Sequence, residues 1–219
     1  AMVDAQIKRL IKTDSYYGKM YRDAGIDGVS SQEDFEKLPF SSKADLRYAY
    51  PLGIQAVPDE EVVRIHSSSG TTGKPVIIPY TAKDVDDWSL MIARCYEMAG
   101  ITDKDRIQIT AGYGLWTAGI GFQGGCEMGP GNTDKQLQMM VDLKSTVLTA
   151  TSSYALLLSE EINKRNMRDK IYLKKGIFGS ERWSDKMRNY IKTELGVEIY
   201  DIYGLTEIYG PGIGISCAE

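Results

Sequence analysis

Between residues 105 and 201, segments with the composition of β-strands alternate with segments that have helical periodicity. The expected strands cover residues 105–110, 145–150, 174–179 and 197–201, and the expected helices cover residues 134–142, 154–164 and 185–195. Such alternation predicts a parallel sheet with right-handed crossovers. We therefore expect an α/β fold, with a mixed or parallel sheet flanked by helices.

The first 60 residues have a different, mostly helical pattern. Residues 4–24 are expected to form a single helix that Gly25 ends. Further along, β-branched stretches at residues 62–66 and 76–80 read as strands, and a helix is expected over residues 81–98. We therefore divide the chain into a helical segment, residues 1–60, and an α/β part, residues 61–219.

A run rich in hydroxyls and glycines joins the two strands expected at residues 62–66 and 76–80. Hydroxyls and backbone N–H groups bind phosphate oxygens, glycine allows close approach of a ligand, and lysine adds positive charge. Pro75 stands where the common nucleotide P-loop has Ser or Thr, so the run is of another type. A solvated turn is the alternative to a polyphosphate site. The expected phosphate-binding residues are Ser67, Ser68, Ser69, Gly70, Thr71, Thr72, Gly73 and Lys74.

The segment 202–212 follows the last expected strand, and ligands of parallel α/β sheets bind beyond the carboxyl ends of strands. Tyr203 offers a flat face for a base, and Thr206 offers a hydroxyl to a phosphate. Glu207 would repel that phosphate unless a divalent cation lay between them, and Mg²⁺ suits this role. The alternative is a surface loop with an incidental acid.

Two other segments follow expected strand ends. Residues 112–122 combine glycines with aromatic side chains that can wall an apolar pocket, although a buried helix packed through small residues remains an alternative. Residues 179–183 can present backbone to a ligand, while Ser184 caps the helix at residues 185–195.

Composition narrows the class of protein. A net charge of −4 argues against a nucleic-acid partner, and no apolar run has the length of a membrane span. Three scattered cysteines indicate a reducing, cytoplasmic setting, and a single histidine excludes sites built from several histidines. Ala1 before Met2 reads as a tag remnant. Residues 210–219 are expected to be a loop, so we expect the chain to be part of a longer protein.

Together these segments resemble the phenylacetate–coenzyme A ligase family of acyl-adenylate-forming enzymes, over nearly the whole chain. The motifs that carry the resemblance keep the family's order and spacing. They are Leu38-Pro39-Phe40, Lys43-Ala44-Asp45-Leu46-Arg47, Tyr50-Pro51-Leu52-Gly53, residues 64–75, Gly112-Tyr113-Gly114-Leu115, Gly176-Ile177-Phe178-Gly179, Asp201-Ile202-Tyr203-Gly204-Leu205-Thr206-Glu207 and Gly210-Pro211-Gly212.

The resemblance implies a two-step reaction. An aryl carboxylic acid of the phenylacetate type and ATP give an acyl adenylate, and coenzyme A then displaces AMP to give the thioester. ATP, Mg²⁺ and coenzyme A are the implied cofactors, with no nucleic-acid or membrane partner and with a homodimer as one possible assembly. The chain is expected to be an incomplete N-terminal adenylation domain that lacks the C-terminal lid domain. Residues 1–219 alone should then bind nucleotide weakly and form no thioester.

The resemblance also implies residue roles. Residues 67–74 would hold the β- and γ-phosphates, with Lys74, Thr206 and Glu207 as catalytic residues and Glu207 as the Mg²⁺ ligand. The remaining implied nucleotide contacts are Gly179, Ser180, Glu181, Asp201, Ile202, Tyr203 and Gly204. The implied contacts to the acid are Tyr113, Trp116, Gly119 and Pro211.

The sequence departs from the family pattern at two of these places. Residues 180–183 read Ser-Glu-Arg-Trp instead of Ala-Glu-Pro-Trp, and Trp116 replaces a common phenylalanine. Cys217 lies where some relatives begin a cysteine-containing zinc site. Two alternative functions stay open. One is an adenylyltransferase that moves AMP to an acceptor other than coenzyme A, and the other is a non-catalytic nucleotide-binding protein.

Overall fold

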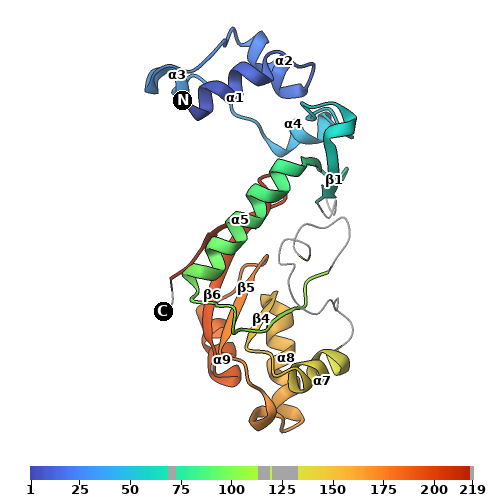
Figure 1. Ribbon diagram of the computed structural model, residues 1–219, viewed down its shortest axis with the longest axis vertical. Coiled ribbons are helices and arrows are strands. Elements are labelled where there is room, and N and C mark those ends of the chain that lie inside the picture. The colour runs from blue at the N-terminus through green and yellow to red at the C-terminus, as the bar shows by residue number, and fades with distance from the viewer. Residues whose placement is uncertain (69–72, 113–118, 120–132, 218–219) are drawn as a thin grey trace. The chain divides into compact units, whose positions relative to one another are not determined.

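The computed structural model describes residues 1–68, 73–112, 119 and 133–217. The chain divides into two compact units, Ala1–Val85 and Asp86–Glu219, with the boundary inside helix α5 (Figure 1). The strands on either side of the hydroxyl-rich run fall in the first unit, together with the N-terminal helices.

The first unit is built from short helices and one hairpin. Its described elements are α1 (Met2–Leu10), α2 (Tyr16–Asp23), α3 (Gln32–Glu36), α4 (Lys43–Tyr48), the 3-10 turn η1 (Asp59–Glu61), β1 (Val62–Ser67) and β2 (Ile77–Thr81). Strands β1 and β2 pair in antiparallel fashion, with Ser67 opposite Ile77. The sequence-based strands at residues 62–66 and 76–80 are therefore confirmed to within a residue.

The single helix expected over residues 4–24 is wrong. Two helices form instead, because α1 ends at Leu10 and α2 begins at Tyr16. Ser15 caps α2 by accepting a hydrogen bond from the Gly18 N–H at 3.1 Å, and the Thr13 hydroxyl donates to the Leu10 carbonyl at 2.8 Å. Short hydroxyl side chains bond nearby backbone groups in this way and so compete with continuation of a helix. The spacing of apolar residues survives the break, which is why periodicity alone did not reveal it.

The second unit contains a five-stranded sheet in the order β3-β4-β5-β6-β7. Strands β3 to β6 are parallel, and β7 pairs antiparallel with β6. The strands are β3 (Ile107–Ile109), β4 (Val147–Thr151), β5 (Lys175–Gly179), β6 (Glu198–Leu205) and β7 (Gly210–Ile215). The helical elements are α5 (Ala82–Met98), α7 (Thr133–Asp142), α8 (Ser152–Lys164), η2 (Arg168–Lys170) and α9 (Asp185–Leu195). The first four residues of α5 belong to the first unit. The predicted α/β class with a mixed sheet flanked by helices is confirmed.

One face of the sheet forms the main core. Leu148, Phe178 and Ile199 point from successive parallel strands into a cluster that α7, α8 and α9 complete with Met140, Leu158 and Leu195. Figure 1 shows α8 and α9 beside strands β4, β5 and β6. Helices on the same face are what right-handed crossovers between strands in sequential order require.

The end of the chain differs from its expected form. The last strand was expected to stop at residue 201, but β6 continues to Leu205, and the expected loop at residues 210–219 contains strand β7. Glycine-rich sequence carries little strand propensity. Pairing with β6 therefore makes residues 210–215 a strand where local preference does not.

Removing the ring of Phe178 should unfold the second unit at much lower denaturant concentration. Phe178 is fully buried in the core, so Phe178→Ala should cost about 3–5 kcal/mol of unfolding free energy through lost burial and a residual cavity. Leu157 on α8 is 41% exposed, and Leu157→Ala should change that free energy by no more than about 0.5 kcal/mol. Urea unfolding followed by circular dichroism measures both, and equal effects would contradict the core assignment.

Candidate functional site

The four parallel strands end at one edge of the sheet, and the predicted segments that begin at residues 179 and 202 start there; most of the segment 112–122 lies outside the described residues. Strand β6 reaches beyond its neighbour, because Ile202 pairs with Gly179, the last residue of β5. Residues Tyr203 to Leu205 therefore extend past the carboxyl end of β5. This is the region where parallel α/β sheets bind ligands.

Thr206 and Glu207 occupy the tip of the β6–β7 hairpin. They are the two central residues of a turn that the Ile208 N–H closes by donating to the Leu205 carbonyl at 3.0 Å. Thr206 is 9% exposed, whereas Tyr203 is 63% exposed and so presents its ring to solvent. The structure thus places these three predicted site residues on one short hairpin.

The segment that follows β5 is shaped by close backbone packing. A methyl group on Gly179 would overlap the carbonyl oxygen of Ile202, so this position requires glycine. Ser180 adopts a φ of 68°, which non-glycine residues rarely do. The Glu181 carboxylate accepts from the Ser153 N–H at 2.9 Å and from the Ser153 hydroxyl at 3.0 Å, in the first turn of α8. The segment 179–181 is therefore held against both β6 and α8.

Asp201 connects β6 with the segment that contains Trp183 and with the chain after β7. Its carboxylate accepts from the Trp183 indole N–H at 3.0 Å, and its backbone N–H donates to the Ser216 hydroxyl at 2.9 Å. The Ser216 N–H returns a bond to the Asp201 carbonyl at 2.9 Å. Asp201, which was predicted to contact nucleotide, thus also fixes the segments around it.

The flanks of the hydroxyl-rich run are tied together within the first unit. Ser68 donates its N–H to the Val76 carbonyl at 2.9 Å, and the Val76 N–H donates to the Ser68 hydroxyl oxygen at 2.9 Å. The Lys74 ammonium lies 5.1 Å from the centroid of the Tyr50 ring, within the range of a cation–π interaction. Gly73 has a φ of 133°, a backbone conformation that glycine alone adopts readily. Ser67 ends β1 and is 9% exposed.

The remaining predicted site residues are only partly covered by the structure. Ser69, Gly70, Thr71, Thr72, Tyr113 and Trp116 lie outside the described residues. Gly119 is packed so that a methyl group there would overlap the carbonyl oxygen of Gly112. Pro211 lies on β7 opposite Gly204.

Two features near the predicted residues were missed by the sequence reasoning. Tyr50 was not predicted to contact Lys74, and Trp88 was not predicted to contact Pro211, although its indole N–H donates to the Pro211 carbonyl at 2.9 Å. Both pairs join residues that are far apart in the sequence, so no local pattern signals them.

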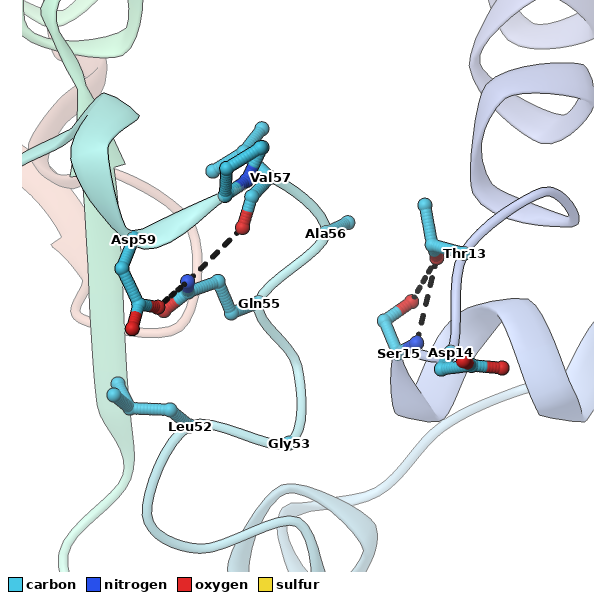
Figure 2. A pocket seen from close by; sticks show the side chains of 10 residues that line it. Thr13, Asp14, Ser15, Leu52, Gly53, Gln55, Ala56, Val57 and Asp59 are labelled. Atoms are coloured by element: carbon cyan, nitrogen blue, oxygen red, sulfur yellow. Dashed lines mark hydrogen bonds between the residues drawn. The ribbon is translucent and has the colours of Figure 1, made fainter.

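The structure also contains a pocket of about 470 Å³ in the first unit, which the sequence did not predict. Figure 2 shows it between the turn at Thr13, Asp14 and Ser15 and the loop that contains Leu52, Gln55 and Asp59. Gln55 spans this loop by donating to the Val57 carbonyl at 3.0 Å and to the Asp59 carboxylate at 2.7 Å. The Gln55 amide therefore bonds atoms of its own loop. We assign no ligand to this pocket.

Within the described ranges, no group of three or more His, Cys, Asp or Glu residues is arranged to hold a metal ion. Cys217 is exposed there without such a group around it. Among the helices the structure describes, none combines the length and apolar character needed to cross a membrane.

Comparison with known proteins identifies the relatives of the chain. No protein-family model matches it. The phenylacetate–coenzyme A ligases of Pseudomonas putida and Escherichia coli K12 are each 41% identical to it, and the alignments cover 93% of this chain and 49% of each enzyme. The Thermus thermophilus enzyme of the same description is 37% identical, with 100% of this chain and 53% of the enzyme covered. The chain therefore spans about half the length of the curated relatives it matches.

Solved structures show the same fold. A 2-hydroxyisobutyryl-CoA ligase in complex with 2-HIB-AMP and CoA superposes with a TM-score of 0.83 at 24% identity, covering 97% of this chain and 51% of that enzyme. A long-chain-fatty-acid–CoA ligase from Archaeoglobus fulgidus gives a TM-score of 0.57 at 20% identity over 73% of this chain. The resemblance in the sequence is thus confirmed: over nearly its whole length, the chain is similar to about half of a phenylacetate–coenzyme A ligase and shares the fold of acyl-CoA ligases.

Proposed function

We propose that the protein to which this chain belongs activates an aryl carboxylic acid of the phenylacetate type with ATP and transfers the acyl group to coenzyme A. The acid's carboxylate oxygen attacks the α-phosphorus of ATP, and the bond from this phosphorus to the bridging oxygen breaks to release pyrophosphate. The coenzyme A thiolate then attacks the acyl carbon, and AMP leaves. The observation that carries the proposal is the hairpin with Tyr203, Thr206 and Glu207 at the carboxyl edge of a parallel sheet, in a chain about 40% identical to such ligases.

The roles follow from the chemistry of each group. The exposed ring of Tyr203 offers a stacking surface for adenine. The backbone of residues 179–181, which the Glu181–Ser153 hydrogen bonds hold in place, would bond the edge of the adenine ring. The Thr206 hydroxyl would donate to the α-phosphate. Lys74 and the hydroxyl-rich run supply the positive charge and donors for the leaving pyrophosphate. Preorganised donors of this kind stabilise the negative charge that develops in the transition state. The main contribution of the protein to the rate would therefore be to position these donors.

The donor set of the hairpin fits a Mg²⁺ ion that is shared with phosphate oxygens. Mg²⁺ is usually bound by one or two carboxylates together with substrate phosphates rather than by an all-protein cage. Glu207 at the turn would provide one carboxylate, and it directly follows Thr206 in the chain. Bound there, Mg²⁺ would supply charge neutralisation to the phosphates.

Carboxylate-dependent ATP–pyrophosphate exchange by the complete protein tests the proposal. Phenylacetate should support exchange, and indole-acetate, benzoate and short aliphatic acids define the limits of the acid site. Chelation of Mg²⁺ with EDTA should stop exchange, and excess MgCl₂ should restore it. Absence of exchange with every aryl acid would reject the substrate class, and exchange that survives EDTA would reject the metal.

Coenzyme A separates the leading proposal from the adenylyltransferase alternative, because only a ligase converts the adenylate to acyl-CoA. We expect the complete protein to release acyl-CoA, as measured by chromatography. Residues 1–219 alone should bind ATP weakly and form no thioester. Rapid acyl-CoA formation by these 219 residues would show that the remaining length of the relatives is not needed.

A further inference from the structure

The β6–β7 hairpin receives a hydrogen bond from each of the two tryptophans that the structure describes. Trp183 donates its indole N–H to the Asp201 carboxylate at 3.0 Å, and Trp88 donates its indole N–H to the Pro211 carbonyl at 2.9 Å. Asp201 lies on β6 and Pro211 on β7, on either side of the turn that carries Thr206 and Glu207. The two bonds therefore hold both arms of this hairpin.

The pairing between the two arms is itself interrupted. The register of β6 and β7 shifts between Tyr203 and Gly204, and Pro211 is the residue that pairs with Gly204 beyond the shift. A bulge leaves backbone groups out of the regular ladder and changes the local twist. Bonds from outside the hairpin therefore add to the interrupted pairing within it.

Trp88 reaches the hairpin from helix α5 and is held by its surroundings. It is 2% exposed, and one turn further along the helix the Ile92 side chain packs against Gly212, where a Cβ would lie 2.5 Å from Ile92 Cδ1. Gly212 has a φ of 102°, so this position favours glycine for both its backbone and its packing. Burial raises the pKa of the Cys95 thiol, which stays protonated and donates to the Gly212 carbonyl at an Sγ–O distance of 3.5 Å. Helix α5 thus fixes residues 211–212 at three consecutive turns.

Trp183 reaches the hairpin from the segment between β5 and α9. Its ring packs edge-on against Phe178, with centroids 6.0 Å apart at 84°, and the Arg188 guanidinium lies 5.7 Å from the ring. These contacts attach the indole to the main core on one side and to α9 on the other. The bond to Asp201 therefore ties β6 to rigid elements of the unit.

We propose that Trp88 and Trp183 are positioning residues for the β6–β7 hairpin, each holding one arm so that Thr206 and Glu207 keep the geometry that adenylate formation requires. The effect on the reaction rests on the function proposed above, whereas the effect on the hairpin does not. Misplacement of reacting groups by a small distance lowers the rate of a reaction even when the fold is intact. Loss of either indole N–H should therefore lower kcat.

The test uses Trp88→Phe and Trp183→Phe, which keep an aromatic ring and remove the N–H donor. Tyr190→Phe on α9, which removes a hydroxyl from a side chain that is 41% exposed, is the matched control. At saturating ATP and acid, each tryptophan variant should lower kcat of ATP–pyrophosphate exchange by about five- to tenfold. This factor corresponds to the free energy that one hydrogen bond typically contributes. In Trp183→Phe the KM for the carboxylic acid should stay within about twofold, because the lost bond goes to Asp201, which is not among the expected contacts to the acid. The control should match the wild type in both constants.

Amide hydrogen exchange gives a readout that does not depend on activity. Residues 202–210 should exchange about five- to tenfold faster in each tryptophan variant, while α8 and β4 keep their protection. Unchanged protection of residues 202–210 in both variants would overturn the proposal, as would a lower melting temperature with unchanged kcat and unchanged local protection. If Trp88→Phe does not fold, Trp183→Phe decides by the same criteria. If the wild type shows no exchange activity, the proposed function fails and the amide protection alone decides on the positioning role.

Discussion

Replacement of Glu207 by glutamine is expected to abolish Mg²⁺-dependent ATP–pyrophosphate exchange in the complete protein. The amide keeps the size of the side chain and one acceptor oxygen, but it replaces the other oxygen with an NH₂ donor and removes the charge that a Mg²⁺ ion needs. Loss of one preorganised electrostatic contact in an active site costs about 10²- to 10³-fold in kcat, and loss of the metal contact should reach at least that value. Initial rates of exchange with phenylacetate, measured across a range of MgCl₂ concentrations, give the comparison.

Glu160→Gln is the matched control, because Glu160 is an exposed acid on α8 without a role in the proposed site. It should exchange at the wild-type rate. The melting temperature of Glu207→Gln should stay close to that of the wild type, since the turn itself is closed by backbone atoms. Exchange by Glu207→Gln at the rate of Glu160→Gln would reject the metal-binding role.

Replacement of Gly204 by alanine is expected to disrupt the hairpin from within. The new Cβ would overlap the carbonyl oxygen of Gly210 and lie 2.5 Å from Cα of Pro211, and both are backbone atoms that cannot rotate away. Overpacking of this kind typically costs about 1–3 kcal/mol of stability, and relief by separating β6 from β7 would move Thr206 and Glu207. We therefore expect a lower urea midpoint together with a loss of exchange activity of at least about 100-fold, similar to the loss of one oxyanion-hole donor.

Gly214→Ala on the same hairpin makes the identical chemical change where there is room. No heavy atom of the described structure other than its chain neighbours lies within 4 Å of the position that this Cβ would take. Its stability should stay within about 0.5 kcal/mol of the wild type, and its exchange rate should not change. Equal behaviour of the two alanine variants would show that close packing at Gly204 does not shape the hairpin.

Local sequence patterns predicted much of the second unit. The helix over residues 185–195 is observed with the predicted bounds, and its cap is confirmed, because the Ser184 hydroxyl accepts from the Met187 N–H at 3.3 Å. The four parallel strands were predicted because β-branched and apolar runs bounded by turn residues are typical of strands. The strand at residues 210–215 was missed, since glycine carries no preference for it.

The sequence also predicted that segments beginning at residues 179 and 202 would lie at the carboxyl edge of the sheet, whereas most of the third segment, 112–122, lies outside the described residues. This inference needed only the order of strands and helices, because parallel strands joined by right-handed crossovers all end on the same side. It did not predict that Glu181 would bond Ser153 or that Asp201 would bond Trp183. Each of these bonds joins residues whose separation along the chain carries no periodic signal.

The α/β class, the hydroxyl-rich run and the segment 201–207, for which nucleotide binding is a prediction, were read from the order of residue types alone, because each depends on neighbours within about one element of secondary structure. The break at Ser15, the extension of β6 to Leu205 and the anchoring of the hairpin by Trp88 and Trp183 were decided only in the folded chain. Their physical reason is common to all three. Burial and close approach between distant residues determine which hydrogen bonds can form, and these contacts outweigh the weak local preferences of the residues involved.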